Sequence, residues 1–151
     1  MAAARTLLIG YGNTLRGDDA LGPMAVEQMR AALPYLEFVS CHQLGPELAG
    51  QMAAFDCVVF LDASSAGEPG TVQLQRLQAG VTPAGSFTHH MHPAVLLELA
   101  QTLYGRAPKA MLATGVGASF ESGEGLSEAA QRALDEICRV VPRLLQSPDL
   151  W

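Results

Sequence analysis

The sequence predicts an α/β fold, a three-layer α/β/α sandwich with a mostly parallel, twisted sheet of about five strands. Short segments rich in Leu, Val, Ile and Phe alternate along the chain with longer segments of helical periodicity. Such alternation is typical of a parallel sheet that helices cover on both faces. The length of 151 residues suits one core, so we expect residues 1–151 to form a single domain.

The predicted strands are mostly bounded by turn residues or polar clusters. They cover Arg5–Gly10, Leu36–Cys41, Val58–Asp62, Thr71–Leu77 and Lys109–Val116. The fourth of these segments alternates apolar and polar residues imperfectly and follows the third after a short Ser/Gly/Pro linker. We therefore expect it to be an antiparallel strand or an edge strand of the sheet.

The predicted helices cover Leu21–Leu33, Pro46–Ala54, Pro93–Tyr104 and Ser127–Leu145. In the last helix, apolar residues recur every three or four positions and form one stripe. Ser127 is its expected N-cap, and Glu128 suits the positive end of the helix dipole.

Composition and charge exclude several classes of partner. The formal net charge is −6, which leaves no basic surface for nucleic acid or an anionic membrane. Three widely spaced cysteines form neither a disulfide framework nor a thiolate zinc motif. The first residues lack the features of a secretory signal. We therefore expect a cytoplasmic protein that binds neither nucleic acid nor membrane.

Polar residues at the carboxyl ends of strands locate the chemistry, because ligands of open α/β sheets bind there. The first such segment is residues 10–19 (GYGNTLRGDD). Its glycines allow the backbone to approach a ligand closely, and it ends with the carboxylates of Asp18 and Asp19. A dinucleotide-binding fingerprint would need a glycine where Leu15 stands and an acidic residue after the second strand, and the sequence has neither. Helix capping explains one of the two carboxylates and leaves the other unexplained.

Two further segments follow strands. Asp62 ends a buried apolar strand, where its charge needs a partner or a metal, although such a residue can also simply bind loop amides. Residues 87–93 (FTHHMHP) hold three of the four histidines, His89, His90 and His92, which form either a metal-binding or a solvated loop. His42 follows the second strand and can reach the same rim, although a structural hydrogen bond is its expected role.

The donor types narrow the metals that such a site would hold. Two carboxylates and an imidazole suit a divalent ion such as nickel, zinc, manganese or iron, and they leave coordination positions open. A site of this kind can activate water for hydrolysis, or it can bind a metal that a partner carries.

The ordered set of motifs resembles the hydrogenase maturation proteases, endopeptidases that trim the C-terminal extension of nickel-iron hydrogenase large subunits. The resemblance rests on the glycine-rich run that ends in Asp18 and Asp19, on the strand that ends in Asp62, and on the Thr88-His89 step before a helix. Residues 43–48 and 118–127 also agree with that family, so the resemblance spans nearly the whole chain.

The resemblance implies roles at the matching positions. Asp19, Asp62 and His89 would be the catalytic and nickel-binding residues, Asp18 would be a neighbour or a helix cap, and His90 and then His92 are the next candidates for the imidazole. The nickel would be supplied by the partner, the large-subunit precursor, so that only a metal-loaded substrate is cut.

Other mechanisms and classes are less well matched. The serines after Asp62 lie outside a GxSxG motif, no cysteine precedes a helix in an electropositive setting, and no HExxH motif occurs. A noncatalytic nickel-binding maturation chaperone remains an alternative, because the same ligands could merely hold the ion. A nucleotide-binding Rossmann-like module is the other alternative.

The glycine-rich stretch Gly115–Gly125 is either part of a partner-facing rim or a plain surface connection.

Overall fold

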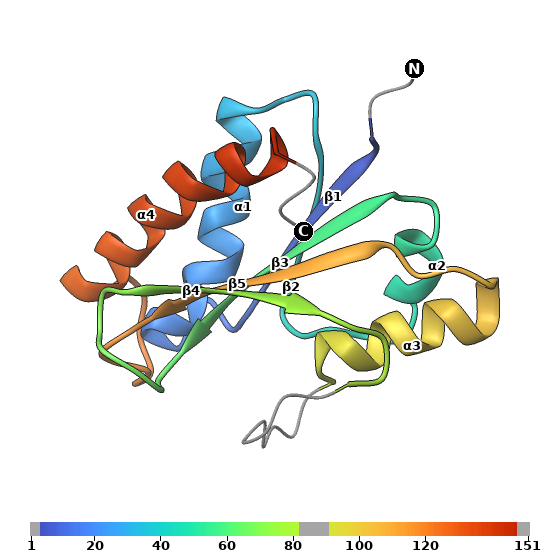
Figure 1. Cartoon of the computed structure of the whole chain (residues 1–151). Helices are drawn as coiled ribbons and strands as arrows, with labels where there is room; N and C mark the ends of the chain where they lie inside the picture. The colour runs from blue at the N-terminus through green and yellow to red at the C-terminus, as the bar shows by residue number, and fades with distance from the viewer. Residues whose placement is uncertain (1–3, 82–90, 148–151) are drawn as a thin grey trace.

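The computed structural model describes residues 4–81 and 91–147. In this part of the chain, five strands form one sheet in the order β2-β1-β3-β5-β4 (Figure 1). The strands are Thr6–Tyr11 (β1), Glu37–Cys41 (β2), Cys57–Ser64 (β3), Val72–Leu77 (β4) and Lys109–Val116 (β5). Strands β2, β1, β3 and β5 are parallel, and β4 pairs antiparallel with β5 at an edge. The predicted sheet is confirmed, including its antiparallel edge strand.

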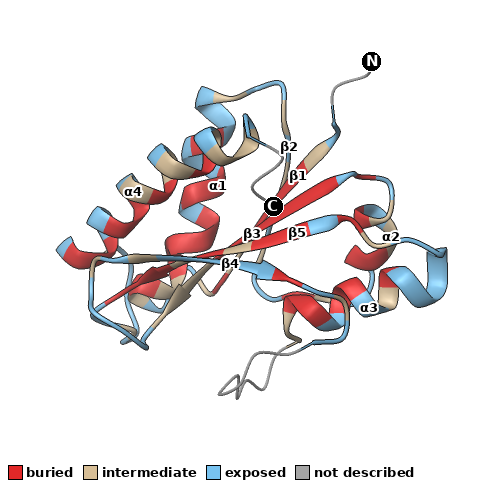
Figure 2. Cartoon of the chain, viewed as in Figure 1, coloured by how far each residue is buried: buried red, intermediate tan, exposed pale blue. Residues whose placement is uncertain are grey.

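Helices cover both faces of this sheet. They are Leu21–Ala32 (α1), Leu48–Met52 (α2), Pro93–Tyr104 (α3) and Glu128–Leu145 (α4), and a 3-10 turn, Gly17–Ala20 (η1), precedes α1. Helices α1 and α4 lie on one face and α2 and α3 on the other, with their buried residues turned toward the sheet (Figures 1 and 2). The structure therefore has the three predicted layers.

Two apolar cores lie between these layers. Successive side chains of a strand point to opposite faces, so β3 sends Val59 and Leu61 to the core under α1 and α4. It sends Val58 and Phe60 to the core under α2 and α3. The next residue of the second set is Asp62, which this alternation places on the α2 and α3 side of the sheet.

Most element bounds agree with the predicted ones to within one residue, but α2 and β3 differ by two residues at an end. Helix α2 is shorter than the predicted Pro46–Ala54, because the chain enters it through turns closed by bonds from Leu48 N–H to Gly45 and from Ala49 N–H to Pro46. Strand β3 extends two residues past Asp62, because Ala63 and Ser64 still pair with β5. Ser127 caps α4 as predicted: its Oγ accepts the N–H of Ala130 at 3.1 Å.

Close packing of α1 against the sheet brings the glycine-rich turn to the strand ends. A Cβ on Gly10 would lie 2.2 Å from the carbonyl oxygen of Gly22, and a Cβ on Gly22 would lie 2.4 Å from that of Leu61. Only glycine fits at both positions, because the obstructing atoms are backbone atoms. The start of α1, and with it the acidic pair at 18–19, is therefore held against β1 and β3.

We expect Gly10→Ala to lower the free energy of unfolding by about 2 to 3 kcal/mol, because the added methyl group forces α1 away from β1. Gly45→Ala is the matched control, since its Cβ would meet only the flexible side chain of Glu47. Urea unfolding of both variants measures the difference. Equal stabilities would show that the Gly10–Gly22 contact does not limit the packing of α1.

Among the described residues, no helix has both the length and the apolar character that crossing a bilayer requires.

Candidate functional site

A cavity of about 450 Å³ opens at the carboxyl ends of the parallel strands. Its walls come from residues 11–13 at the end of β1, Arg16 in the turn that follows, residues 42–44 after β2, 62–65 in β3 and the turn after it, 91–93 at the entry to α3, and Leu112 and Thr114 of β5. Asp19 and Asp62 both line it. The structure thus brings two of the three predicted site residues together at the sheet edge where ligands of this fold class bind.

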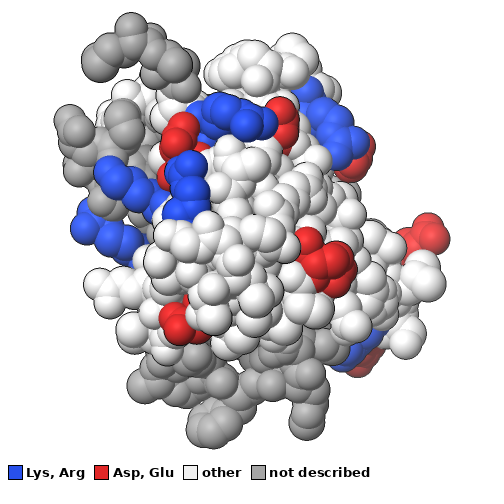
Figure 3. All heavy atoms as spheres, turned by 90° about the vertical axis from the view of Figure 1, so that its right-hand side faces the viewer, with Lys and Arg blue, Asp and Glu red and all other residues white. Residues whose placement is uncertain are grey.

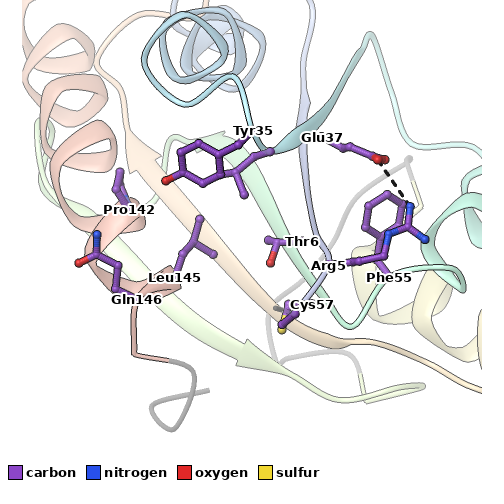
Figure 4. A pocket seen from close by; sticks show the side chains of 11 residues that line it. Arg5, Thr6, Tyr35, Glu37, Phe55, Cys57, Pro142, Leu145 and Gln146 are labelled. Atoms are coloured by element: carbon purple, nitrogen blue, oxygen red, sulfur yellow. Dashed lines mark hydrogen bonds and ion pairs between the residues drawn. The ribbon is translucent and has the colours of Figure 1, made fainter. Parts of the chain in front are cut away.

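A second cavity, of about 600 Å³, lies at the opposite ends of the strands (Figure 4). The first residues of β1, β2 and β3 and the end of α4 line it. Among its described lining residues, the acidic side chain is Glu37, which points toward Arg5 and pairs with it at 3.5 Å (Figure 4). Because that charge is already compensated, the smaller cavity is the better candidate for catalysis.

Asp62 carries an unusual carboxyl group. It stands opposite Thr114 in the parallel pairing of β3 with β5, and its Oδ1 accepts the N–H of Ala63 at 2.8 Å. Burial raises its pKa and nearby Asp19 adds to the rise, while the Ala63 N–H and the Tyr11 hydroxyl counteract it, which leaves the pKa at about 7. Asp62 therefore exchanges a proton near neutral pH.

The turn after β1 fixes the position of Asp19. Its Oδ2 accepts the backbone N–H of Asn13 at 2.6 Å. Gly12 has φ 150°, and a Cβ there would lie 1.9 Å from the carbonyl oxygen of Asp19. The glycine is therefore required for the turn to fold back onto the carboxylate.

Asp18 points the other way and is fully buried. Its carboxylate accepts the N–H groups of Ala118, Ser119 and Ser127 at 2.7, 2.9 and 2.7 Å, and the Ser127 hydroxyl at 2.6 Å. Burial alone would raise its pKa, but these hydrogen bonds outweigh burial and lower it. Neither aspartate caps α1, whose first turn has no side-chain cap; Asp18 instead binds the loop after β5 and the N-cap of α4.

The predicted imidazole ligand cannot be placed in the same way. His89 and the runner-up His90 lie outside the described residues. His92 lines the cavity and is the N-cap of α3, with its Nδ1 accepting the N–H of Ala94 at 3.0 Å. Burial lowers the pKa of His92, which favours the neutral ring. His42 is exposed on the cavity rim.

Tyr11 is a site residue that the sequence reasoning missed. It lines the cavity beside Asp62, and its hydroxyl acts as a hydrogen-bond donor toward that carboxylate. Burial and the charge of Asp62 raise the pKa of Tyr11 well above its ordinary value, so the phenol keeps its proton. The sequence did contain one signal. Side chains alternate between the two faces of a strand, so Tyr11 lies on the same face of β1 as Leu7 and Ile9.

The described residues alone do not complete a metal site. Within residues 4–81 and 91–147, no three His, Cys, Asp or Glu side chains lie close enough together to hold a metal ion. Asp19 and Asp62 nevertheless offer hard oxygen donors to a common cavity.

Known proteins share this fold and part of this sequence. The hydrogenase 2 maturation protease of Escherichia coli K12 is 34% identical over 142 residues, which cover 87% of this chain and 84% of that protein. The hydrogenase maturating endopeptidase HybD from E. coli is 28% identical, with a TM-score of 0.68 and coverage of 95% and 93%. The maturation protease HycI from Thermococcus kodakarensis KOD1 has a TM-score of 0.78, 23% identity and coverage of 95% and 94%. No protein-family model matches the chain.

Together, the α/β fold, the acidic cavity and these relatives define the class of protein as a peptidase. The chain belongs to the hydrogenase maturation protease family.

Proposed function

We propose that this peptidase removes the C-terminal extension of a nickel-iron hydrogenase large-subunit precursor and that it recognises nickel already inserted in that precursor. The observation that carries the proposal is the convergence of Asp19 and Asp62 in one cavity at the carboxyl end of the sheet. The names of the E. coli relatives, a hydrogenase 2 maturation protease and a hydrogenase maturating endopeptidase, support a hydrogenase as the client.

The charge in the cavity suits a cation carried by the substrate. Burial and the Asp19 charge disfavour the ionised form of Asp62, so a divalent ion that enters with the precursor relieves an unfavourable charge. His89 is the proposed third ligand. It precedes the cavity residue His92 by three positions in the sequence.

The chemistry divides between the nickel and the protein. Asp19, Asp62 and His89 would hold the substrate's nickel, which would position the precursor and polarise the scissile carbonyl or the attacking water. A carboxylate of the cavity takes a proton from that water and returns it to the leaving amine. Tyr11 keeps the Asp62 carboxylate in place through its hydroxyl group.

Mass spectrometry of purified, nickel-loaded precursor tests the proposal. We expect the wild-type protein to shorten the precursor, whereas Asp19→Asn and His89→Ala lower the cleavage rate at least about 100-fold, because each removes a proposed nickel ligand. Asp135→Asn, on the exposed face of α4, is the control and is expected to cleave normally.

Each contrary result has a distinct meaning. An unchanged precursor mass with the wild-type protein would leave the cavity as the nickel site of a noncatalytic maturation chaperone. Equal cleavage of nickel-free precursor would contradict nickel recognition. Wild-type activity in either variant would remove that residue from the site.

We also propose that the protein acts in the cytoplasm. The free cysteines Cys41, Cys57 and Cys138 support a reducing compartment.

A further inference from the structure

Helix α3 exposes apolar side chains along one flank. Val95 and Leu103 are 39% and 63% exposed, and Leu99 between them is half-buried. Residues four apart lie above one another on a helix, so the three side chains form a row about 12 Å long, here called the α3 stripe. Val81, which is 57% exposed, lies near its first turn, because the N–H of Gly80 binds the carbonyl of Ala94 at 3.0 Å.

The other long outer helix shows how a solvated helix of this protein is built. Along α4, charged residues recur throughout the sequence: Glu128, Arg132, Asp135, Glu136, Arg139 and Arg143. By contrast, the charged residue of α3 is Glu98, and α2 has none. Much of the face that Figure 3 shows carries no charged group, although separate Asp and Glu groups lie on it, and most of its Lys and Arg lie toward the upper and left edges. Exposed apolar side chains on a surface with few charges are typical of a protein-binding surface.

The α3 stripe begins at the candidate site. Met91, His92 and Pro93 line the cavity, and Val95 lies in the first turn of α3, two residues after Pro93. A protein whose C-terminal segment enters the cavity therefore brings the surface next to that segment onto α3.

We propose that the α3 stripe is the docking surface for the folded body of the precursor, which contacts it through an uncharged apolar patch next to the C-terminal extension. This inference rests on the proposed function. The cavity then holds the segment that is cut, and the stripe provides affinity for the protein that carries it.

Cleavage kinetics with nickel-loaded precursor test this assignment. Leu103→Glu and, independently, Val95→Glu place a charge in the apolar contact, and each is expected to raise KM at least about 10-fold while kcat changes less than about twofold. Leu74→Glu is the matched control. Leu74 is 45% exposed on β4 and shares a strand face with Val72, which packs in the core under α1 and α4. Its KM is expected to equal that of the wild type.

The outcomes separate this inference from the function on which it rests. Absence of cleavage by the wild-type protein overturns the proposed function. Normal wild-type cleavage with unchanged KM in both stripe variants overturns the docking surface alone. Light scattering with size-exclusion chromatography provides a second criterion: a wild-type dimer that Leu103→Glu dissociates would assign the stripe to self-association and overturn the proposal. Unchanged thermal unfolding midpoints show that the variants are folded.

Discussion

Asp62→Asn is expected to abolish cleavage and to stabilise the metal-free protein above neutral pH. The folded protein holds the Asp62 proton up to a pKa of about 7, whereas an unfolded chain releases it near the ordinary value of 3.8. The contribution of this proton to stability is complete below the unfolded pKa and is lost as the pH rises through the folded pKa. Above pH 7 the wild type therefore bears the full cost of a buried charge, which asparagine does not.

The expected gain is about 2 to 4 kcal/mol at pH 8, with little difference near pH 4, at about 1.4 kcal/mol per unit of pKa. Urea unfolding in the presence of a chelator, at several values between pH 4 and pH 8, measures it. Asp135→Asn should follow the wild type throughout. If Asp62→Asn loses stability with pH as the wild type does, Asp62 does not keep its proton in the folded state; if it cleaves normally, Asp62 is not part of the site.

Asp18→Asn is expected to destabilise the protein by about 3 to 5 kcal/mol, since charge-assisted hydrogen bonds contribute about 1.5 to 3 kcal/mol each. The carboxylate is surrounded by four donor groups, from Ala118, Ser119 and Ser127. An amide offers one acceptor oxygen and turns its own NH₂ group toward donors. Equilibrium urea unfolding measures the loss, and the exposed Asp135→Asn is expected to stay within about 0.5 kcal/mol of wild type.

A milder change provides a second measurement on the same network. Ser127→Ala removes one of the four bonds to Asp18 and the cap of α4, so we expect a loss of about 1 to 2 kcal/mol. A wild-type stability for either variant would show that Asp18 does not hold the loop after β5. Together, the two variants identify Asp18 as structural and leave the chemistry to its neighbour.

The sheet and its covering helices were predictable because hydrophobic periodicity is a local property. Ser127 was recognised as a cap from its own position before an amphipathic stripe. The end of β3 was not predicted, because Ala63 and Ser64 look like the start of a loop in the sequence. They remain extended through their pairing with Gly115 and Val116 of β5. That pairing joins segments about fifty residues apart, which no local pattern reveals.

The site divides in a similar way. The fold rule places residues 18–19 and 62 at one sheet edge, and the structure does bring Asp19 and Asp62 into one cavity. Residue chemistry cannot tell which of two adjacent aspartates faces it. That choice depends on the donors of the loop after β5, one hundred positions away from Asp18. Tyr11 was missed because its alternation with Leu7 and Ile9 indicates only the face of β1 on which it lies, and not the carboxylate that it meets there.

The strand order has a consequence for biosynthesis. Residues 72–77 are translated before residues 109–116, yet β5 lies between β3 and β4 and is the sheet neighbour of β4 in the described chain. On the ribosome, β4 cannot pair with its neighbour until β5 has emerged. The hydrogen bond from Ser127 to the Asp18 carboxylate forms later still, once residue 127 has emerged. The cavity with Asp19 and Asp62 therefore lacks part of its wall until β5, which contributes Leu112 and Thr114, has been made.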